Sequence, residues 1–544
     1  MSGRSELESI EEKKISFVIP VHGESGMFLP RCIHSILEQD YPNKDITVVF
    51  DGEDQFKGAL RQREFFKDDD RIKFFIKKQG GAPAARNYGL DNSDGYYVCF
   101  FDCDSILRAG AIRSWVTAFD ANQDCDFVYN GYRYTMKDKY QTGVLAKDFD
   151  PRLLTCNNYI STMNPIKRDK CPRWDESLEG LQDWHFWLQA VHLNGSKGVK
   201  IDDNLVVTEP PSEESLSGKT HKNHLEIYNK VREKIGIKKR EWVIGTSGAE
   251  FQSMRRARIL DADYHDFGLL MTKPNDYKAI ISMGFYVETP ATPGAIFFKA
   301  NKDCKKIIHF IGTDVYQLSK ASFGAVRQFA KNLPPFVDKI LCNAPWLKEE
   351  LGEMGLDAEL VYCPLESEKL PFYEELPKDY TVAVYRSDTN PMYHEWFMIE
   401  AAKALPDIKF KFFGGEVPRS LNGVPKNVEY LGRVAEEDMP ELIKSTNCIA
   451  RISLHDGFPA SVSEWIISGR EALFNIEAMP ETSFCDIQPR EETIIQDKRT
   501  FIESIRKMQR DPKNLEDRKK SSKFYKELLS VEAYKSKMEN IING

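Results

Sequence analysis

FFDCDSIL, at residues 100–107, places two aspartates directly after an apolar run. Because side chains on a strand alternate between its faces, Asp102 and Asp104 are expected on one side and Cys103 on the other. The apolar run predicts a buried strand with both carboxylates at its carboxyl end, the edge where open α/β sheets bind ligands. Two carboxylates there suit a hard divalent cation that also takes phosphate oxygens and water. A surface turn with a capping aspartate is the alternative.

Around this stretch, short β-branched or aromatic runs alternate with helical patterns. Strands are predicted at 15–21, 45–51, 71–77 and 96–102, and helices at 30–39 and 85–92. Such alternation predicts a parallel sheet covered by helices on both faces, an α/β fold. We expect this first domain at residues 15–225, after a flexible tail at 1–14.

A second α/β series begins near Trp242. Its predicted strands include 277–283, 305–314, 338–344, 380–386, 408–415, 427–433 and 447–453. We expect a first Rossmann-like lobe at 240–365, a charged, proline-bearing linker at 366–379 and a second lobe at 380–485. The pattern of residues 486–544 predicts helices that pack against the rest of the chain and have their charged residues on a solvated face.

The amino-acid composition argues against several classes of protein. Of 544 residues, 41% are hydrophobic, which excludes a mainly disordered chain. A formal net charge of -8 argues against a broad electrostatic grip on nucleic acid. No run approaches the roughly 20 apolar residues of a membrane span. The polar start lacks an apolar signal core, and the 11 cysteines lack paired spacing, so a reduced, cytoplasmic protein is expected.

Four further motifs accompany the D-x-D pair in order along the chain. They are FVIPVHGE (17–24), VVFDGED (48–54), GGAPAARNYGL (80–90) and WDESLEGLQDWHFWLQAVHLNG (174–195). Together they resemble the inverting, nucleotide-sugar-dependent glycosyltransferases of family 2, which have the GT-A fold. The resemblance covers about residues 15–220. It implies transfer of a sugar from a nucleotide diphosphate to an acceptor hydroxyl.

The resemblance also implies a role for each matching residue. Asp183 is the expected general base, which takes the proton of the attacking hydroxyl. The donor-binding candidates are Pro20, His22, Glu24, Asp51, Arg86 and Asp102, and the metal candidates are Asp102, Asp104 and His221. Mn²⁺ or Mg²⁺ would neutralise charge on the departing diphosphate. One departure is Gln182, where the family usually has glutamate before the base.

Each residue also has a purely structural interpretation. Asp183 could cap a helix, and Asp51 could end a strand in a turn. Trp184 and Trp187 are more typical of a core than of a sugar platform. His22, His221 and Arg86 could be ordinary structural or surface groups, and these alternatives stay open.

Residues 242–480 resemble, more loosely, a GT-B glycosyltransferase of family 4 character. IIHFIGTDVYQL (307–318) is similar to a first-domain segment of that family, and Asp456 and Glu464 have the spacing of its acidic pair. Gly457, Phe458 and Arg386 complete the second-site candidates. The usual glutamate is replaced by Asp456, and the usual lysine after the first strand of that lobe is missing. This half is either a second transferase or a diverged sugar- or partner-binding module.

The sequence therefore predicts a metal-dependent inverting glycosyltransferase that uses a UDP-sugar or related donor and a glycan or other hydroxyl acceptor. A bifunctional enzyme with two active sites and a non-catalytic carbohydrate- or nucleotide-binding protein are the alternatives. A binding module needs no base, so the D-x-D pair and Asp183 together favour an enzyme.

Overall fold

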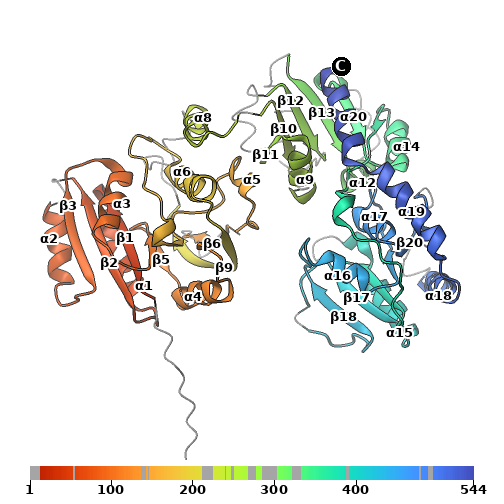
Figure 1. The fold of residues 1–544 in the computed structure, drawn as a ribbon, viewed down its shortest axis with the longest axis horizontal. Coiled ribbons are helices and arrows are strands. Elements are labelled where there is room, and N and C mark those ends of the chain that lie inside the picture. Colours follow the sequence, from red (N-terminus) through yellow and green to blue (C-terminus); the bar gives the residue numbers. More distant parts are fainter. Residues whose placement is uncertain are drawn as a thin grey trace, which may run out of the picture. The chain divides into compact units, whose positions relative to one another are not determined.

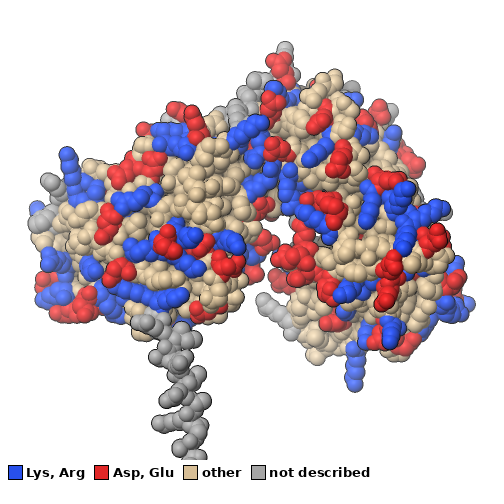
Figure 2. Space-filling model, in the orientation of Figure 1, with Lys and Arg blue, Asp and Glu red and all other residues tan. Residues whose placement is uncertain are grey.

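The computed structural model describes residues 13–52, 56–135, 143–144, 146–210, 224–238, 240–246, 250–266, 277–284, 303–320, 332–387, 391–418, 420–476, 479–487 and 494–544. The chain forms two compact units, Met1–Lys239 and Arg240–Gly544 (Figure 1). Across these described ranges, none of the helices has the length and apolar character needed to span a bilayer. Basic and acidic side chains are interspersed over the visible surface of each unit (Figure 2).

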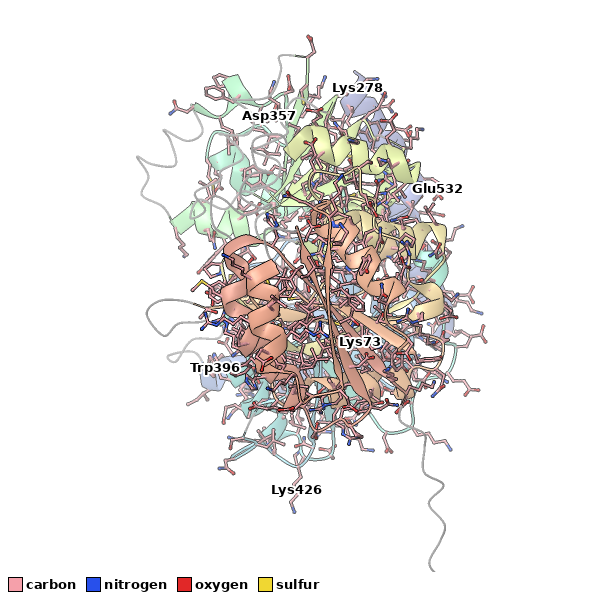
Figure 3. All side chains as sticks on the ribbon, turned by 90° about the vertical axis from the view of Figure 1, so that its left-hand side faces the viewer. Lys73, Lys278, Asp357, Trp396, Lys426 and Glu532 are labelled. Atoms are coloured by element: carbon pink, nitrogen blue, oxygen red, sulfur yellow. The ribbon has the colours of Figure 1, made fainter. Side chains whose placement is uncertain are left out.

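The first unit is built on one sheet with the strand order β3-β2-β1-β4-β8-β6-β9-β5, and β7 pairs with β6. Its strands are β1 (Ile15–Val21), β2 (Lys44–Asp51), β3 (Ile72–Lys77), β4 (Tyr97–Phe100), β5 (Ile106–Leu107), β6 (Phe127–Tyr134), β7 (Gly143–Val144), β8 (Pro165–Lys167) and β9 (Gly198–Thr208). The four strands β3, β2, β1 and β4 are parallel, as predicted. Lys73 is exposed on the edge strand β3, which faces the viewer in Figure 3 and where a charge opposes further strand pairing.

The prediction of a parallel sheet is wrong in part beyond β4. Strand β8 runs antiparallel to both β4 and β6, and β5 runs antiparallel to β9. Strands as short as β5 and β8 contain too few residues to show a two-residue period, so the sequence pattern does not reveal them. The sheet is therefore mixed: β3, β2, β1 and β4 are parallel to one another, β6 is parallel to β9, and the short strands β8 and β5 run antiparallel to their neighbours.

Helices cover both faces of this sheet, as expected for an α/β fold. They are α1 (Leu29–Leu37), α2 (Phe56–Phe65), α3 (Gly81–Asp91), α4 (Ala111–Ala121), α5 (Pro151–Leu154), α6 (Gln182–Leu188) and α8 (His224–Ile235). One apolar core lies between the sheet and α1, α2 and α4. A second core lies against α3, α5, α6 and α8 on the other face. The candidate site lies where this second face meets the carboxyl ends of the parallel strands.

The second unit contains two parallel six-stranded sheets. The first has the order β11-β10-β12-β13-β14-β15, and the second has the order β18-β17-β16-β19-β20-β21. Their strands are β10 (Trp242–Thr246), β11 (Asp263–Asp266), β12 (Ala279–Met283), β13 (Lys305–Phe310), β14 (Lys339–Cys342), β15 (Glu359–Leu360), β16 (Thr381–Tyr385), β17 (Lys409–Phe413), β18 (Val428–Gly432), β19 (Cys448–Arg451), β20 (Glu471–Phe474) and β21 (Ser483–Phe484). The second order is the one common in dinucleotide-binding doubly wound folds.

The helices of this unit are α9 (Glu250–Leu260), α12 (Thr313–Lys320), α14 (Pro345–Glu353), α15 (Glu395–Ala404), α16 (Met439–Lys444), α17 (Ala460–Ile467), α18 (Ile494–Arg510), α19 (Leu515–Leu528) and α20 (Val531–Asn543). One apolar core contains residues of both sheets, among them Ile308, Leu347, Phe458 and Trp465. The two sheets of the second unit are therefore packed together as one body.

Candidate active site

The two aspartates of the D-x-D motif follow β4, whose four residues are all buried. Cys103 is 5% exposed, whereas Asp102 and Asp104 are partly exposed, so the alternation continues past the end of the strand. Burial, and then the charge of Asp102, raises the pKa of the Asp104 carboxyl to about 6. The two carboxylates thus repel each other, and a cation between them would relieve that repulsion.

Arg86 connects α3 to this acidic pair. Its Nη2 donates to Oδ1 of Asp102 at 3.0 Å, and its guanidinium lies 4.4 Å from the ring centre of Trp174. Asn87, the next residue, donates to the carbonyl of Trp174 and accepts from its amide, both at 2.9 Å. The Ala-Arg-Asn segment therefore fixes the segment that begins at Trp174. The Arg86 side chain is only 10% exposed, so the surface-residue interpretation of Arg86 is wrong.

Asp51, at the end of β2, holds the glycines that begin α3. Its Oδ1 accepts from the amide of Gly80 at 2.9 Å, and its Oδ2 accepts from the amide of Gly81 at 2.7 Å. Lys77 donates to the same carboxylate at 3.0 Å. Gly81 has φ +86°, a conformation that favours glycine. Asp51 therefore shapes the glycine turn, and this contact does not depend on a nucleotide.

The remaining candidates at the first strand lie close to Asp51 or outside the described residues. Pro20 pairs with Val49 in the register of β1 and β2. His22 follows β1, and its Nδ1 lies 2.9 Å from the carbonyl oxygen of Asp51. Glu24 falls in the helical turn Gly23–Phe28, but its side chain, like the whole of His221, lies outside the described residues.

Asp183 lies in the first turn of α6. Asn158 donates to its Oδ2 at 2.7 Å. Burial raises the pKa of the Asp183 carboxyl, the hydrogen bond from Asn158 and the charge of Arg86 lower it, and the charge of Asp102 raises it. The structure therefore brings Asp183 into the electrostatic range of Arg86 and Asp102, across from the end of β4.

The helix-cap interpretation of Asp183 is wrong. The residue before the helix is Leu181, which has a left-handed φ of 52° and makes no side-chain cap, so Asp183 is the second residue of α6. Trp184 and Trp187 are 1% and 0% exposed, and their Nε1 atoms donate to backbone carbonyls of Leu154 and Ser161. They are core residues, and they anchor the helix that carries Asp183.

Comparison with known proteins agrees with this geometry. Residues 16–180 match the family model described as glycosyl transferase family 2. The first unit therefore contains a family 2 domain. An uncharacterized glycosyltransferase of Rickettsia conorii is 27% identical over 199 residues, 35% of this chain and 32% of the relative. GlyA of Streptococcus pneumoniae is 39% identical over 103 residues, 19% of this chain and 14% of GlyA. The chain thus spans about a third or less of the length of these two curated relatives.

A further relative, from Campylobacter jejuni, is named GalNAc(5)-diNAcBac-PP-undecaprenol beta-1,3-glucosyltransferase. It is 34% identical over 151 residues, 27% of this chain and 46% of the relative. Among solved structures, HepE of Anabaena in complex with UDP and glucose has a TM-score of 0.43 at 12% identity, covering 56% of this chain and 100% of HepE. TarS of S. aureus in complex with UDP has a TM-score of 0.33 at 17% identity, covering 48% of this chain and 69% of the TarS chain. Both scores lie below 0.5, so these two likenesses carry no weight.

Two residues near the acidic pair of the family 2 domain have no motif that predicts them. Nη2 of Arg31 donates to the backbone carbonyl of Asp104 at 3.0 Å and to Oε1 of Glu209 at 2.5 Å. Arg31 lies on α1, and Glu209 directly follows β9. Only the sheet order brings these distant segments together. Arg31 thereby fixes the backbone of the D-x-D turn.

The metal candidates form an incomplete set of ligands. Within the described ranges, no group of three His, Cys, Asp or Glu side chains is arranged to hold a metal ion. Asp102 and Asp104 are two carboxylates, and a hard cation usually completes such a pair with water and phosphate oxygens. These two residues therefore fit a cation that arrives with a diphosphate, and His221 stays a prediction.

The acidic pair of the second unit is engaged by arginines. Arg451 donates to Oδ2 of Asp456 at 2.6 Å, and both side chains are largely buried. Arg255 of α9 lies 3.7 Å from Glu464, and burial raises the pKa of that carboxyl. Arg386 donates to Glu395 at 2.9 Å.

The loop beside this pair is closed by backbone contacts. A Cβ placed on Gly457 would lie 2.0 Å from the carbonyl oxygen of Ile311, and one on Gly312 would lie 2.4 Å from the amide nitrogen of Gly457. Phe458 is 5% exposed and belongs to the shared core. The loop therefore packs against the other sheet.

Proposed function

We propose that the family 2 domain transfers a sugar from a nucleotide-diphosphate donor to an acceptor hydroxyl, with inversion at the anomeric carbon. The observation that carries the proposal is the placement of Asp183, in the first turn of α6, within electrostatic range of Arg86 and Asp102. A binding module needs no half-buried carboxylate beside this pair, whereas a transferase needs one to accept a proton. The curated relatives, which carry the name glycosyltransferase, support the same reaction class.

The donor, in this proposal, is a UDP-sugar or a related nucleotide sugar. Asp51 accepts from the amides of Gly80 and Gly81 and so fixes the glycine turn at the start of α3. Arg86 adds a fixed positive charge from the same helix. Pro20, His22 and Glu24 belong to the neighbouring β1 and the turn that follows it. Together these groups are suited to a diphosphate and its nucleoside.

The metal, Mn²⁺ or Mg²⁺ in this proposal, would be held by Asp104 with help from Asp102. When bound, it supplies positive charge that stabilises the departing diphosphate. Burial, and then the charge of Asp102, raises the pKa of Asp104, which supports a cation as a partner for the ionised pair. Arg86 compensates Asp102 alone, at 3.0 Å. The pair therefore has the charge that a divalent cation requires.

The proposed reaction is a direct displacement. The acceptor hydroxyl gives its proton to a carboxylate oxygen of Asp183 as its oxygen forms a bond to the anomeric carbon. The bond between that carbon and the diphosphate oxygen breaks on the opposite side, and the diphosphate leaves with the electron pair. Asn158 donates to Oδ2 of Asp183 and thus orients the carboxylate. The neighbouring Gln182 occupies the position where the family usually has glutamate. It donates to the carbonyl of Leu178 at 2.8 Å, which is a structural contact.

For the second unit we propose a binding role and no second transferase site. Arg451 and Arg255 neutralise the acidic pair Asp456 and Glu464, and the loop at Gly457 is filled by backbone of the first sheet. A bifunctional enzyme would have to break both ion pairs before a donor could enter. The GT-B resemblance and the cytoplasmic location stay predictions.

A direct test measures nucleotide release from a panel of UDP-, GDP- and dTDP-sugars with Mn²⁺, Mg²⁺ or EDTA. We expect release from one donor that depends on the cation. The variant Asp183→Asn should lose this release, and the variant Asp456→Asn should keep it. Absence of release with every donor and cation would favour the non-catalytic binding protein. Release from two donors, one of which is lost in Asp456→Asn, would instead support the bifunctional enzyme.

A further inference from the structure

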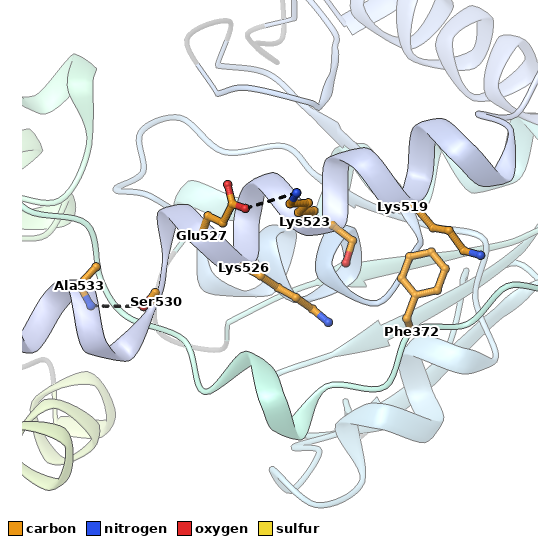
Figure 4. A pocket seen from close by; sticks show the side chains of 8 residues that line it. Phe372, Lys519, Lys523, Lys526, Glu527, Ser530 and Ala533 are labelled. Atoms are coloured by element: carbon orange, nitrogen blue, oxygen red, sulfur yellow. Dashed lines mark hydrogen bonds and ion pairs between the residues drawn. The ribbon is translucent and has the colours of Figure 1, made fainter.

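An open groove of about 690 Å³ lies along α19, at a distance in sequence from every residue of the candidate active site. Its other wall is the segment that leads from β15 to β16, represented by Phe372. The lining residues are Phe372, Lys519, Ser522, Lys523, Lys526 and Glu527, together with the start of α20 (Figure 4). A volume of this size accommodates a ligand of several sugar or nucleotide units.

The groove carries an excess of positive charge. Lys519 lies 2.6 Å from Glu374, and Lys523 lies 3.9 Å from Glu527. Lys526 belongs to no ion pair recorded for the described residues, and it extends from α19 on the same side as Phe372 and Lys519 (Figure 4). Three lysines therefore face two glutamates. Lys519 and Lys526 are two helical turns apart, which separates their attachment points by roughly 10 Å along the groove.

An aromatic ring forms the apolar part of the groove. Phe372 packs closely against Gly469, because a Cβ on that glycine would lie 2.7 Å from the ring. This contact fixes the ring, and the side of the ring that faces α19 forms part of the groove wall. Ser522 is 4% exposed and uses its hydroxyl to donate to the carbonyl of Ile467, so it forms a fixed floor. A rigid ring beside spaced cations is suited to a ligand with apolar ring faces and repeated negative charges.

We propose that this groove binds an anionic glycan, a sugar chain whose units carry carboxylate or phosphate groups. The apolar faces of its sugar rings would lie on Phe372, and its charges would be met by Lys519 and Lys526. The choice of a sugar chain rests on the proposed sugar transfer, because such a chain is an acceptor or product of that reaction. In this proposal the groove holds the sugar chain on the second unit, whereas proton transfer to Asp183 takes place on the first.

The test uses the full-length chain and a fluorescently labelled hexamer of galacturonic acid, whose binding is followed by anisotropy at low and at moderate salt. We expect saturable binding that weakens with salt, as ion pairs require. The variant Lys519→Ala/Lys526→Ala should bind roughly fivefold to tenfold more weakly. Phe372→Leu should weaken binding without altering its salt dependence, since it changes the ring and no charge. Maltohexaose, which is neutral, should not compete.

Lys520→Ala is the matched control, because Lys520 is exposed on the same helix and does not line the groove. It should bind the hexamer as the wild type does. Thermal unfolding of each variant checks that the helix remains packed. An equal loss of hexamer affinity in Lys520→Ala would overturn the assignment of the groove. Failure of the wild-type chain to bind the hexamer would also overturn it. Equally tight binding of an oligothymidylate of similar charge would overturn the assignment to a glycan.

Donor release measured on the same preparations separates the two proposals. If release persists while the hexamer does not bind, the groove assignment fails alone. If the hexamer binds with the expected pattern but no donor is cleaved under any condition, the proposed transfer fails and the groove is left as a binding site for acidic sugars.

Discussion

Arg86 donates to Asp102 at 3.0 Å, which joins the glycine-led helix α3 to the acidic end of β4. The same guanidinium lies over Trp174, at the start of the segment that leads to Asp183. One side chain therefore links three of the motifs that resemble family 2.

Replacing Arg86 by Met should weaken donor binding by roughly tenfold or more, because a hydrogen bond to a charged group contributes about 1.5–3 kcal/mol. Binding of UDP to the full chain, followed by calorimetry, checks this. Arg63→Met is a suitable control, since Arg63 is exposed on α2. Unchanged UDP affinity in the Arg86 variant would remove Arg86 from the donor site.

Replacing Asp183 by Asn should lower turnover by roughly 10²- to 10⁴-fold while donor affinity is retained, because general-base catalysis contributes a factor of that size. Steady-state transfer assays and UDP binding give the two values. The control is Glu179→Gln, which removes an exposed carboxylate four residues away. Near-normal turnover in Asp183→Asn would assign the base to another residue.

The pH dependence of cation binding should follow Asp104. Its pKa is raised to about 6, so its ionised form is disfavoured in the folded chain. Without cation, folding stability should therefore fall as pH rises from about 4 towards 6, where the folded chain still holds a proton that the unfolded chain has lost. Mn²⁺ should restore stability, and its effect should grow through pH 6. Thermal unfolding at several pH values, with and without Mn²⁺, measures both changes.

The variant Asp104→Asn should abolish this Mn²⁺ effect, since the amide cannot ionise. Asp70→Asn, an exposed carboxylate on the same unit, serves as the control. A Mn²⁺ stabilisation that is equal at pH 5 and pH 8 in the wild type would place the cation elsewhere.

Replacing Arg451 by Met should destabilise the second unit by roughly 3–5 kcal/mol, because it leaves the carboxylate of Asp456 buried without its partner. Urea unfolding checks the size of the loss. Arg433→Met, at an exposed position, should change stability little. A loss below about 1 kcal/mol, the size of a surface ion pair, would show that the pair is solvated.

The strands β1 to β4 could be predicted from the sequence, whereas β6 and β9, which are 8 and 11 residues long, were not predicted. The predicted strand at 15–21 coincides with β1, and the strand at 45–51 differs from β2 by one residue. Such strands are buried on both faces, so their apolar runs are continuous. Helix α3 begins at Gly81, earlier than predicted, because Asp51 satisfies the amides of Gly80 and Gly81 from another strand.

The residues of the candidate site also fall into two groups, those that lie in a sequence motif and those that do not. Asp102 and Asp104 follow β4, and Asp183 on α6 lies within electrostatic range of Asp102, while the catalytic roles of all three stay predictions. Asn158 and Arg31, which orient Asp183 and the D-x-D turn, carry no local signal, since each acts across a long stretch of chain. Contacts of that kind depend on the sheet order, and the antiparallel strands after β4 that produce this order are too short to be read from the sequence.

The apolar core common to both sheets of the second unit limits how this protein can be divided in the laboratory. A fragment that ended within segment 366–379 would keep Leu347 but lose Phe458 and Trp465, and its bared interior would make it prone to aggregate. A cut near residue 239 separates the two units and leaves each interior whole. Truncation experiments that seek the donor and the glycan on separate fragments should therefore begin there.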